Sequence, residues 1–326
     1  MKNRGFTLIE LLGVIMILGI LALITFPPIL EQIKNSKQEI KNSTKILITD
    51  AAKDYYEDNI NNYEKTEGIT YCIDINTLTD NGYLNKKIKD ENINDISNTK
   101  KVKMIYHNNK FEYDVVDSCT KYTVTFDANG GSVDIDSKEV IQDSVYGELP
   151  TPARAGYTFM GWNGKNMLDF ESWLNSFSTA TRGTIVKDNN TIMLTATAND
   201  AYTNTYGDAS SFKIMVEPNK NYTFSWSSDS NKTGLQYIFL NGQASSGNAF
   251  NSNGSKNNRT FLTKNDTNYI NIRFGVSTAD DSITYSNAQI EEGETATDYE
   301  PYYITSDTKV VQQKDHTLKA IWKANW

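Results

Sequence analysis

Residues 4–12 of this chain read RGFTLIELL, and the apolar run that starts at Phe6 continues to Phe26. As a helix, this run spans about 31 Å at about 1.5 Å per residue, which matches the hydrocarbon core of a bilayer. Lys2 and Arg4 place two positive charges before the run, a flank that favours the cytoplasmic side. The sequence therefore predicts a single transmembrane helix over 6–26, with the remaining 300 residues outside the cytoplasm.

Glu10 is the only charged residue inside this run. A charge at the centre of a membrane helix costs about 2.5–3.5 kcal/mol on insertion scales, and less near the helix end where Glu10 lies. Such residues usually have a partner. A secretory signal peptide would instead combine an apolar core of about 7–15 residues with an A-x-A-like cleavage site, and the sequence has neither. Glu10 is therefore the residue of the run that points to function.

The string GFTLIELL resembles the prepilin signal of type IV pilins and type II secretion pseudopilins, over residues 1 to about 66. The resemblance implies that a prepilin peptidase cuts between Gly5 and Phe6. Residues 1–5 would then be a leader peptide, and Phe6 would become the N-methylated terminus. It also implies that Glu10 pairs with the terminal ammonium of a neighbouring subunit during filament assembly. The alternative is a plain membrane anchor in which Glu10 only reaches the interface.

We expect one long helix from Phe6 to about Lys65, within a pilin-type segment 6–66, kinked at Pro27 and Pro28. Beyond the prolines an apolar stripe recurs at three, four or seven residues. It consists of Ile33, Ile40, Thr44, Leu47, Ile48, Ala51 and Tyr55. The stripe can pack against sibling subunits or be buried under the protein's own globular head, and the sequence allows both.

A small pilin head is expected over 67–120, with strands at 69–73, 102–106 and 110–116. Cys72 and Cys119 bracket this head, 47 positions apart, in a region expected outside the reducing cytoplasm. A disulfide is the natural interpretation. Two free thiols are the alternative, because many bacteria with one membrane make few disulfides.

The composition changes at Lys121 to alternating strands and glycine turns. The stretch AGYTFMGW at 155–162 resembles the internalin-type B-repeat, a small β-grasp-like module of bacterial surface proteins. The ending of that module, His-Thr-Leu-x-Ala-x-Trp, occurs here at 316–322. We therefore expect one split repeat, 121–163 plus 303–326, with a second domain inserted over 164–302.

Alternation within the insert predicts seven or eight short strands, which indicates a β-sandwich. The strands are expected at 192–196, 212–216, 222–226, 236–240, 259–262, 270–276 and 283–290. Residues 288–302 resemble the closing strand of carbohydrate-binding jelly-roll modules. The expected fold is thus α+β and multidomain: a long transmembrane helix with a small pilin head, then a β-grasp-like repeat with an inserted jelly roll.

Carbohydrate binding commonly uses aromatic rings stacked on sugar faces, with amides and carboxylates nearby. The candidate rings are Trp173, Tyr202, Tyr206, Trp226 and Tyr237, and the candidate polar partners are Asn204, Asp208, Asn241 and Gln243. Trp226 alternates with Tyr222 and Phe224, which favours the core for it. Trp173 and Tyr206 lie in less periodic surroundings and are the preferred glycan-binding candidates.

The charges and residue counts exclude several other classes. The chain has 32 basic and 40 acidic residues, a net charge of −8, and no long basic block, so nucleic acid is not an expected partner. Two His and two Cys are too few for a structural zinc site. No catalytic motif is recognisable, so we expect no enzyme, no catalytic residue and no cofactor. Structural calcium at Asp169, Glu171 and Asp281 is an option, and solvated surface carboxylates are the alternative.

The features together predict a minor pilin or pseudopilin-like subunit of a type IV filament-type machine with an extracellular adhesive or glycan-binding head. Its expected partners are prepilin peptidase, other pilin-like subunits, the membrane and surface or environmental glycans. It would be a single-pass protein of the cell membrane, reaching the cell surface or a filament after processing. A membrane-anchored sugar-binding protein outside any filament is the alternative function.

Overall fold

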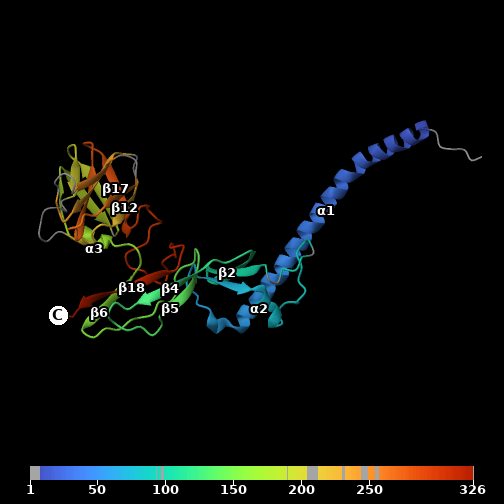
Figure 1. Cartoon of the computed structure of the whole chain (residues 1–326), viewed down its shortest axis with the longest axis horizontal. Coiled ribbons are helices and arrows are strands. Elements are labelled where there is room, and N and C mark those ends of the chain that lie inside the picture. Colours follow the sequence, from blue (N-terminus) through green and yellow to red (C-terminus); the bar gives the residue numbers. More distant parts are fainter. Residues whose placement is uncertain are drawn as a thin grey trace, which may run out of the picture. The chain divides into compact units, whose positions relative to one another are not determined.

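The computed structural model describes residues 8–92, 94–96, 99–188, 190–203, 212–229, 232–243, 249–253 and 257–325, the segment 249–253 by its backbone alone. It divides into two compact units, 1–120 and 121–326, which we describe separately. Figure 1 labels the main elements. Gly5, Phe6, Asn204, Tyr206 and Asp208 lie outside the described residues.

The first unit begins with helix α1, Leu8–Asp58, which continues through Pro27 and Pro28. The ribbon of α1 changes direction in its N-terminal part (Figure 1). The helix ends at Asp58, seven residues before the expected Lys65, and a short 3₁₀ turn η1, Ile60–Asn62, follows it. Asparagine side chains compete with the helix for backbone partners. Accordingly, the Asn59 amide donates to the Tyr55 carbonyl of the last turn (2.8 Å).

The turn after α1 directs Tyr63 into an aromatic cluster on the head. The Tyr63 ring lies 4.9 Å from the Tyr71 ring and 5.5 Å from the Tyr56 ring, both edge to face. Phe111 completes the cluster, 4.8 Å from Tyr56. Burial raises the pKa of Tyr63 to about 12 and that of Tyr71 to about 12. The chain after Asp58 therefore packs its aromatic rings on the head, where the sequence had predicted about two more turns of helix.

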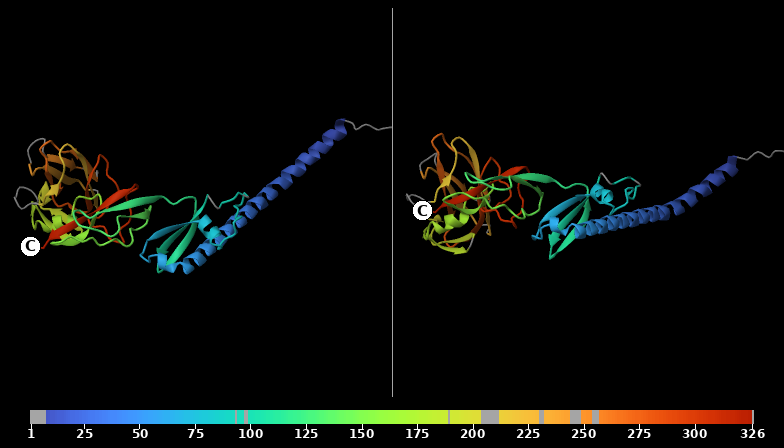
Figure 2. Two further views of the ribbon diagram at one scale, coloured as in Figure 1. Left: turned by 60° about the horizontal axis from the view of Figure 1, so that its bottom comes forward. Right: turned by 90° about the horizontal axis from the view of Figure 1, so that it is seen from below.

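The head is an antiparallel sheet in the order β1-β2-β3, with a short helix α2. The elements are β1 Thr70–Asp74, α2 Ile75–Asp80, β2 Lys101–His107 and β3 Lys110–Val116. The sheet lies against the C-terminal part of α1 in both views of Figure 2. Each expected strand of the head is therefore present, with its bounds within a residue or two.

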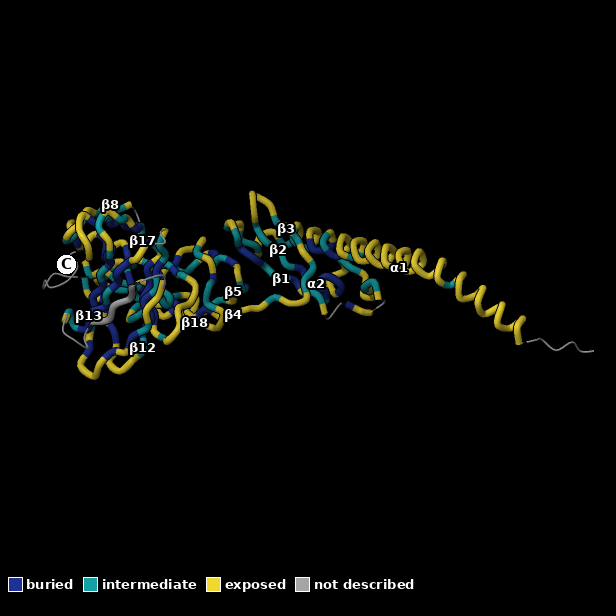
Figure 3. The backbone as a smooth tube through the Cα atoms, turned by 90° about the horizontal axis from the view of Figure 1, so that it is seen from above, coloured by how far each residue is buried: buried dark blue, intermediate teal, exposed yellow. Residues whose placement is uncertain are grey.

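The apolar stripe of α1 is buried only in its C-terminal part. Ile48 and Ala51 of the stripe are buried against the head, as is their neighbour Ala52, whereas Leu47 stays 60% exposed. Ile33 and Ile40 remain 49% and 48% exposed. Figure 3 shows the same change along the helix, from exposed to buried as it reaches the sheet. One part of the stripe therefore belongs to the head, and the other is open to partners.

Cys72 and Cys119 are joined as a disulfide, with their Cα atoms 6.4 Å apart. The bond ties the middle of β1 to the end of the unit, just after β3. The loop that it closes contains α2, β2 and β3. A thin core under a single helix benefits from such a cross-link, because the disulfide removes conformations from the unfolded chain.

The second unit begins with a four-stranded sheet built from two distant stretches of chain. Its strands are β4 Lys121–Asp127, β5 Ser137–Ile141, β6 Tyr157–Asn163 and β18 His316–Ala324, in the order β5-β4-β18-β6. Strand β18 pairs parallel with β4 and antiparallel with β6. Phe126, Trp162 and Leu318 share its core. The sheet thus includes both stretches assigned to the split repeat, while the exact domain boundaries stay a prediction.

Between β6 and β18 an eleven-stranded sheet curls into two layers. Its elements are α3 Phe170–Asn175, β7 Ala180–Thr181, β8 Gly183–Asp188, β9 Thr191–Ala196, β10 Ala201–Thr203, β11 Ile214–Met215, β12 Asn221–Ser228, β13 Gly234–Leu240, β14 Ala249–Asn253, β15 Asn258–Leu262, β16 Tyr269–Val276 and β17 Ser282–Glu292. The path runs β14-β13-β16-β10-β7-β8-β9-β17-β12-β15, and β11 pairs with β16. The sequence missed β7, β8, β10 and β14, of which β7 and β10 are too short to show a period of two.

Phe274 of β16 marks where the two layers pack face to face. Its ring lies 5.4 Å from Phe224, 6.2 Å from Trp226 and 4.4 Å from Tyr285. Strands β12 and β17 belong to the opposite layer. Trp226 is only 5% exposed, in the core position that its alternation favoured. The expected class, a long apolar helix followed by β-rich domains with a sandwich, is confirmed.

The disulfide gives a prediction for the head. Replacing Cys72 with serine is expected to lower the free energy of unfolding of the head by about 4 kcal/mol, the chain-entropy value for a loop of this length. All five tryptophans lie beyond residue 120, so hydrogen exchange of β1 to β3 is the suitable measurement.

The Cys119→Ser variant and the double variant should match Cys72→Ser, and exchange in the second unit should stay unchanged. Equal protection of β1 to β3 in all these variants and the wild type would show that the two thiols are not paired in solution.

Candidate functional site

Trp173, a preferred candidate for sugar stacking, lies in the core of the sandwich. Its side chain is 1% exposed. The ring stacks on Phe170 at 5.3 Å and meets Phe177 and Phe274 edge to face at 4.8 and 5.6 Å. Helix α3 therefore closes one end of the core with this indole. The expectation that Trp173 contacts a glycan was wrong. Trp173 lies on a helix too short to show a periodic pattern, so its sequence gave no sign that the side chain points into the core.

Tyr202 and Tyr237 lie on the outer face of one layer, on strands that flank β16. Tyr237 of β13 pairs with Arg273, and Tyr202 of β10 pairs with Gly275 two residues further along β16. Ile272 and Phe274, the residues on either side of Arg273 in β16, belong to the core. Since side chains alternate between the faces of a strand, Arg273 and its two tyrosine neighbours share the opposite face.

Arg273 connects the aromatic rings of this face. Its guanidinium carbon lies 4.1 Å from the centre of the Tyr202 ring and 5.2 Å from that of Phe239. The Tyr237 and Phe239 rings stack at 6.0 Å with an interplanar angle of 12°. Tyr202, Tyr237 and Arg273 are half-buried, and Phe239 is buried. We call these four residues the arginine–tyrosine face.

The charges of the arginine–tyrosine face make it a hydrogen-bond donor. Burial raises the pKa of Tyr237, the negative charge of Asp200 raises it further, and the positive charge of Arg273 opposes both. The phenol therefore keeps its proton at neutral pH. A protonated phenol, a guanidinium and flat ring faces are the groups that bind hydroxyl, carboxylate and apolar C–H surfaces of a polar ligand.

Sequence reasoning found the two tyrosines but missed Arg273 and Phe239. A charged residue within the apolar run Tyr269–Val276 was the available signal, because an arginine inside a strand needs aromatic or acidic neighbours. Asn241, expected as a polar contact, has a structural task instead. Its side chain donates to the Asp266 carbonyl (2.8 Å) and accepts from the Asn268 amide (2.9 Å), which fixes the turn before β16.

Two of the carboxylates considered for calcium, Asp169 and Asp281, have protein partners. Asp169 accepts from the backbone and hydroxyl of Ser172, at 3.0 and 2.7 Å, and caps helix α3. Asp281 forms an ion pair with Lys232 at 2.8 Å. Within the described residues, no group of three or more His, Cys, Asp and Glu side chains could hold a metal ion. The bonds made by Asp169 and Asp281 are typical of structural carboxylates.

The N-terminal candidate site lies on α1. The helix contains a window with a mean hydropathy of 2.7, long and apolar enough to cross a membrane. Its large apolar side chains are exposed along this part, as lipid-facing residues are, and Glu10 lies on the same exposed surface. The arrangement places a carboxylate two residues into the helix that spans the bilayer.

Two family models match parts of the chain. The prokaryotic N-terminal methylation motif matches residues 1–26, and the Listeria-Bacteroides repeat domain matches residues 122–198. The prepilin-type N-terminus and the repeat are thereby confirmed, and the motif together with α1 supports membrane anchoring by a single span. The repeat match runs 35 residues past β6, into α3 and strands β7 to β9, which the structure packs with the sandwich.

The comparison with solved structures gives matches to part of the chain, all with low TM-scores. A tailspike protein 4 domain of bacteriophage CBA120 shares 13% identity over 43% of this chain and 20% of its own, with a TM-score of 0.26. A chain of the accessory secretory protein 1, 2 and 3 structure from Streptococcus pneumoniae shares 10% over 40% and 96%, with a TM-score of 0.26. A family 29 carbohydrate-binding module from Piromyces equi shares 14% over 54% and 92%, with a TM-score of 0.24.

Scores this low identify no ligand for this chain. The chain spans about a fifth of the length of the tailspike domain. No curated protein matches the chain.

Trp173 and Tyr237 differ in burial, so their substitutions should change the stability of the second unit by different amounts. Trp173→Ala is expected to lower the free energy of unfolding of the second unit by about 3–5 kcal/mol, because a large ring leaves a cavity in the core. Tyr237→Ala should cost much less, since its ring lies half-exposed on the outer face. Urea unfolding followed by the remaining tryptophans measures both, and an equal loss for the two variants would make Tyr237 a structural residue.

Proposed function

We propose that the protein is a minor pilin or pseudopilin-like subunit of a type IV filament-type machine that displays a glycan-binding head. The observation that carries this proposal is the N-terminal methylation motif on an apolar helix that holds Glu10 on its surface. In this scheme prepilin peptidase removes residues 1–5, and Phe6 is methylated. The Glu10 carboxylate then pairs with the terminal ammonium of another subunit, which neutralises a charge at membrane depth.

The exposed part of the α1 stripe supports assembly. Ile33 and Ile40 are apolar, exposed and outside the head's own core, so they offer a surface to sibling helices. In this proposal the head and the second unit lie outside the cytoplasm, in agreement with the positive flank at Lys2 and Arg4. The second unit has 206 residues, which is bulky for every subunit of a dense filament, so a minor or tip position is proposed.

The arginine–tyrosine face is the proposed binding surface of the head. Its ring faces suit the C–H faces of a sugar, and its phenol and guanidinium suit hydroxyls and carboxylates. Arg273 therefore favours glycans that carry an acid group. We propose a binding protein without catalytic activity. A membrane-anchored sugar-binding protein outside any filament is the second candidate, and mapping the N-terminus of the mature protein separates the two.

Glu10→Val is expected to leave peptidase processing intact and to prevent incorporation into filaments, because the neighbouring terminal ammonium loses its partner. Immunoblotting of sheared surface fractions and of membranes measures both steps. Glu31→Val, on the same helix beyond the apolar run, is the matched control and should assemble normally. Wild-type incorporation of Glu10→Val would contradict the assembly role.

Arg273→Gln is expected to weaken binding of carboxylated glycans by about tenfold, the range for losing a charge-assisted hydrogen bond. A glycan array probed with the full chain in detergent measures the effect. Arg259→Gln removes the same charge from the exposed strand β15 and should bind as the wild type does. A failure of the wild type to bind any glycan would instead favour a protein ligand for this face.

A further inference from the structure

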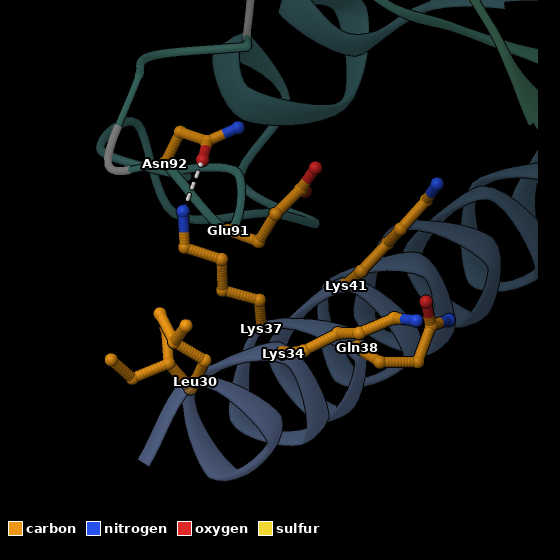
Figure 4. Close-up of a pocket in the computed structure, with 8 residues that line it drawn as sticks. Leu30, Lys34, Lys37, Gln38, Lys41, Glu91 and Asn92 are labelled. Atoms are coloured by element: carbon orange, nitrogen blue, oxygen red, sulfur yellow. Dashed lines mark hydrogen bonds between the residues drawn. The ribbon is translucent and has the colours of Figure 1, made fainter. Parts of the chain in front are cut away.

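A groove beside α1 carries a second site, just beyond the membrane-spanning part. It has a volume of about 370 Å³ and is formed by one face of α1 and the loop before β2. Three lysines of the helix, Lys34, Lys37 and Lys41, line it in successive turns (Figure 4). The positions differ by three and four residues, so the lysines share one face of the helix. We call this cavity the lysine groove.

The lysine groove is positive in a chain that is negative overall. Its three lysines and one carboxylate, Glu91, give a local charge of +2, against −8 for the whole chain. The next lysine of the same face, Lys45, pairs with Asp114 of β3 at 2.6 Å and so belongs to the head. Lys37 donates to the Asn92 side chain at 3.0 Å, which holds one cation against the loop wall. The groove therefore suits an anion.

From its membrane-proximal end, the lysine groove is lined first by apolar and then by positively charged side chains. A phospholipid presents the complementary order, with apolar acyl chains followed by a negatively charged headgroup. Leu30 and Ile33, which line its membrane-proximal end, are 62% and 49% exposed. Lys34 lies eight residues beyond Phe26, about 12 Å along the helix axis. The headgroup layer adds about 5–8 Å beyond the hydrocarbon core, and a lysine side chain can reach the remaining distance.

From this geometry we infer that the lysine groove binds the headgroup of an anionic phospholipid of the membrane in which α1 is anchored. Leu30 and Ile33 contact the glycerol and headgroup layer, Lys34 contacts the phosphate, and Lys37 and Lys41 attract the anionic headgroup from further along the helix. A soluble anion would use the lysines and leave the two apolar side chains exposed to water, so a lipid fits the groove better. The inference rests on the single membrane span and does not depend on filament assembly.

The test compares lipids bound to the full chain in detergent by native mass spectrometry. Wild-type protein should prefer short-chain phosphatidylglycerol over phosphatidylcholine of the same acyl length by about 25-fold, because each net lysine near an anionic headgroup contributes a factor of about five. The Lys34→Gln, Lys37→Gln, Lys41→Gln triple variant should bind both lipids equally.

A second triple variant, Lys53→Gln, Lys87→Gln, Lys323→Gln, removes the same charge from exposed sites elsewhere and should keep the wild-type preference. Unchanged hydrogen-exchange protection of β1 to β3 would show that the groove variant is folded. Equal lipid preference in the two triple variants would overturn the inference.

Two further measurements separate the sources of the anion. Inorganic phosphate and sn-glycerol 3-phosphate, each in excess, should fail to displace phosphatidylglycerol. Displacement by either would mean that the groove holds a soluble phosphate, which overturns the lipid assignment. A groove variant with normal lipid preference but defective filament incorporation would assign the lysines to a partner subunit instead. Glu10→Val should leave lipid preference unchanged, so failure of the assembly proposal and of this inference are distinguishable.

Discussion

The low dielectric of the bilayer is the constraint on which the first unit depends. A carboxylate at this depth loses its hydration, and the free energy of that loss must be offset by another charge or by reaching the interface. Helix α1 solves most of the backbone part of the problem within itself, because its amides are bonded along the helix except at Pro27 and Pro28, which have no N–H. Glu10 carries the one charge of the apolar run 6–26, so the cost of losing hydration falls on this residue.

A comparable constraint shapes the second unit, where the chain leaves the four-stranded sheet after β6 and returns to it at β18. The two connections meet at Glu300, whose side chain is fully buried. Its carboxylate accepts from the Lys165 amide at 2.7 Å and from the Gln312 side chain at 3.1 Å. A side chain at Gly164 would put its Cβ 2.2 Å from the same carboxylate, so the close approach requires glycine. The buried oxygens of Glu300 thus accept hydrogen bonds from residues that come before β7 and after β17.

The sequence predicts secondary structure and burial well where one local pattern determines them. It predicts them less well where contacts between distant residues determine them. The apolar run and Glu10 are local features, so the membrane helix and its motif were readable directly. Trp226 was assigned to the core because strand alternation applied to it, whereas Trp173 lies on a helix of one and a half turns with no period to read. The C-terminal end of α1 depends on where the Tyr63 ring packs. Arg273 can be recognised as a candidate binding residue only once the sheet places it beside Tyr202. Those contacts join residues far apart in sequence, which no local pattern contains.

The place of β18 in the repeat sheet has a consequence for how the protein folds. Leu318 pairs with Phe126, 192 residues earlier, so β18 can take its place between β4 and β6 only after the chain has returned over that distance. Closing a loop of that length is slow and entropically unfavourable. The sandwich shortens it, because the Asn163 side chain donates to the Tyr302 carbonyl at 2.6 Å and so brings both ends of the insert together. Holding residues 163 and 302 together shortens the effective loop between β6 and β18, which lowers the entropic cost of completing the four-stranded sheet.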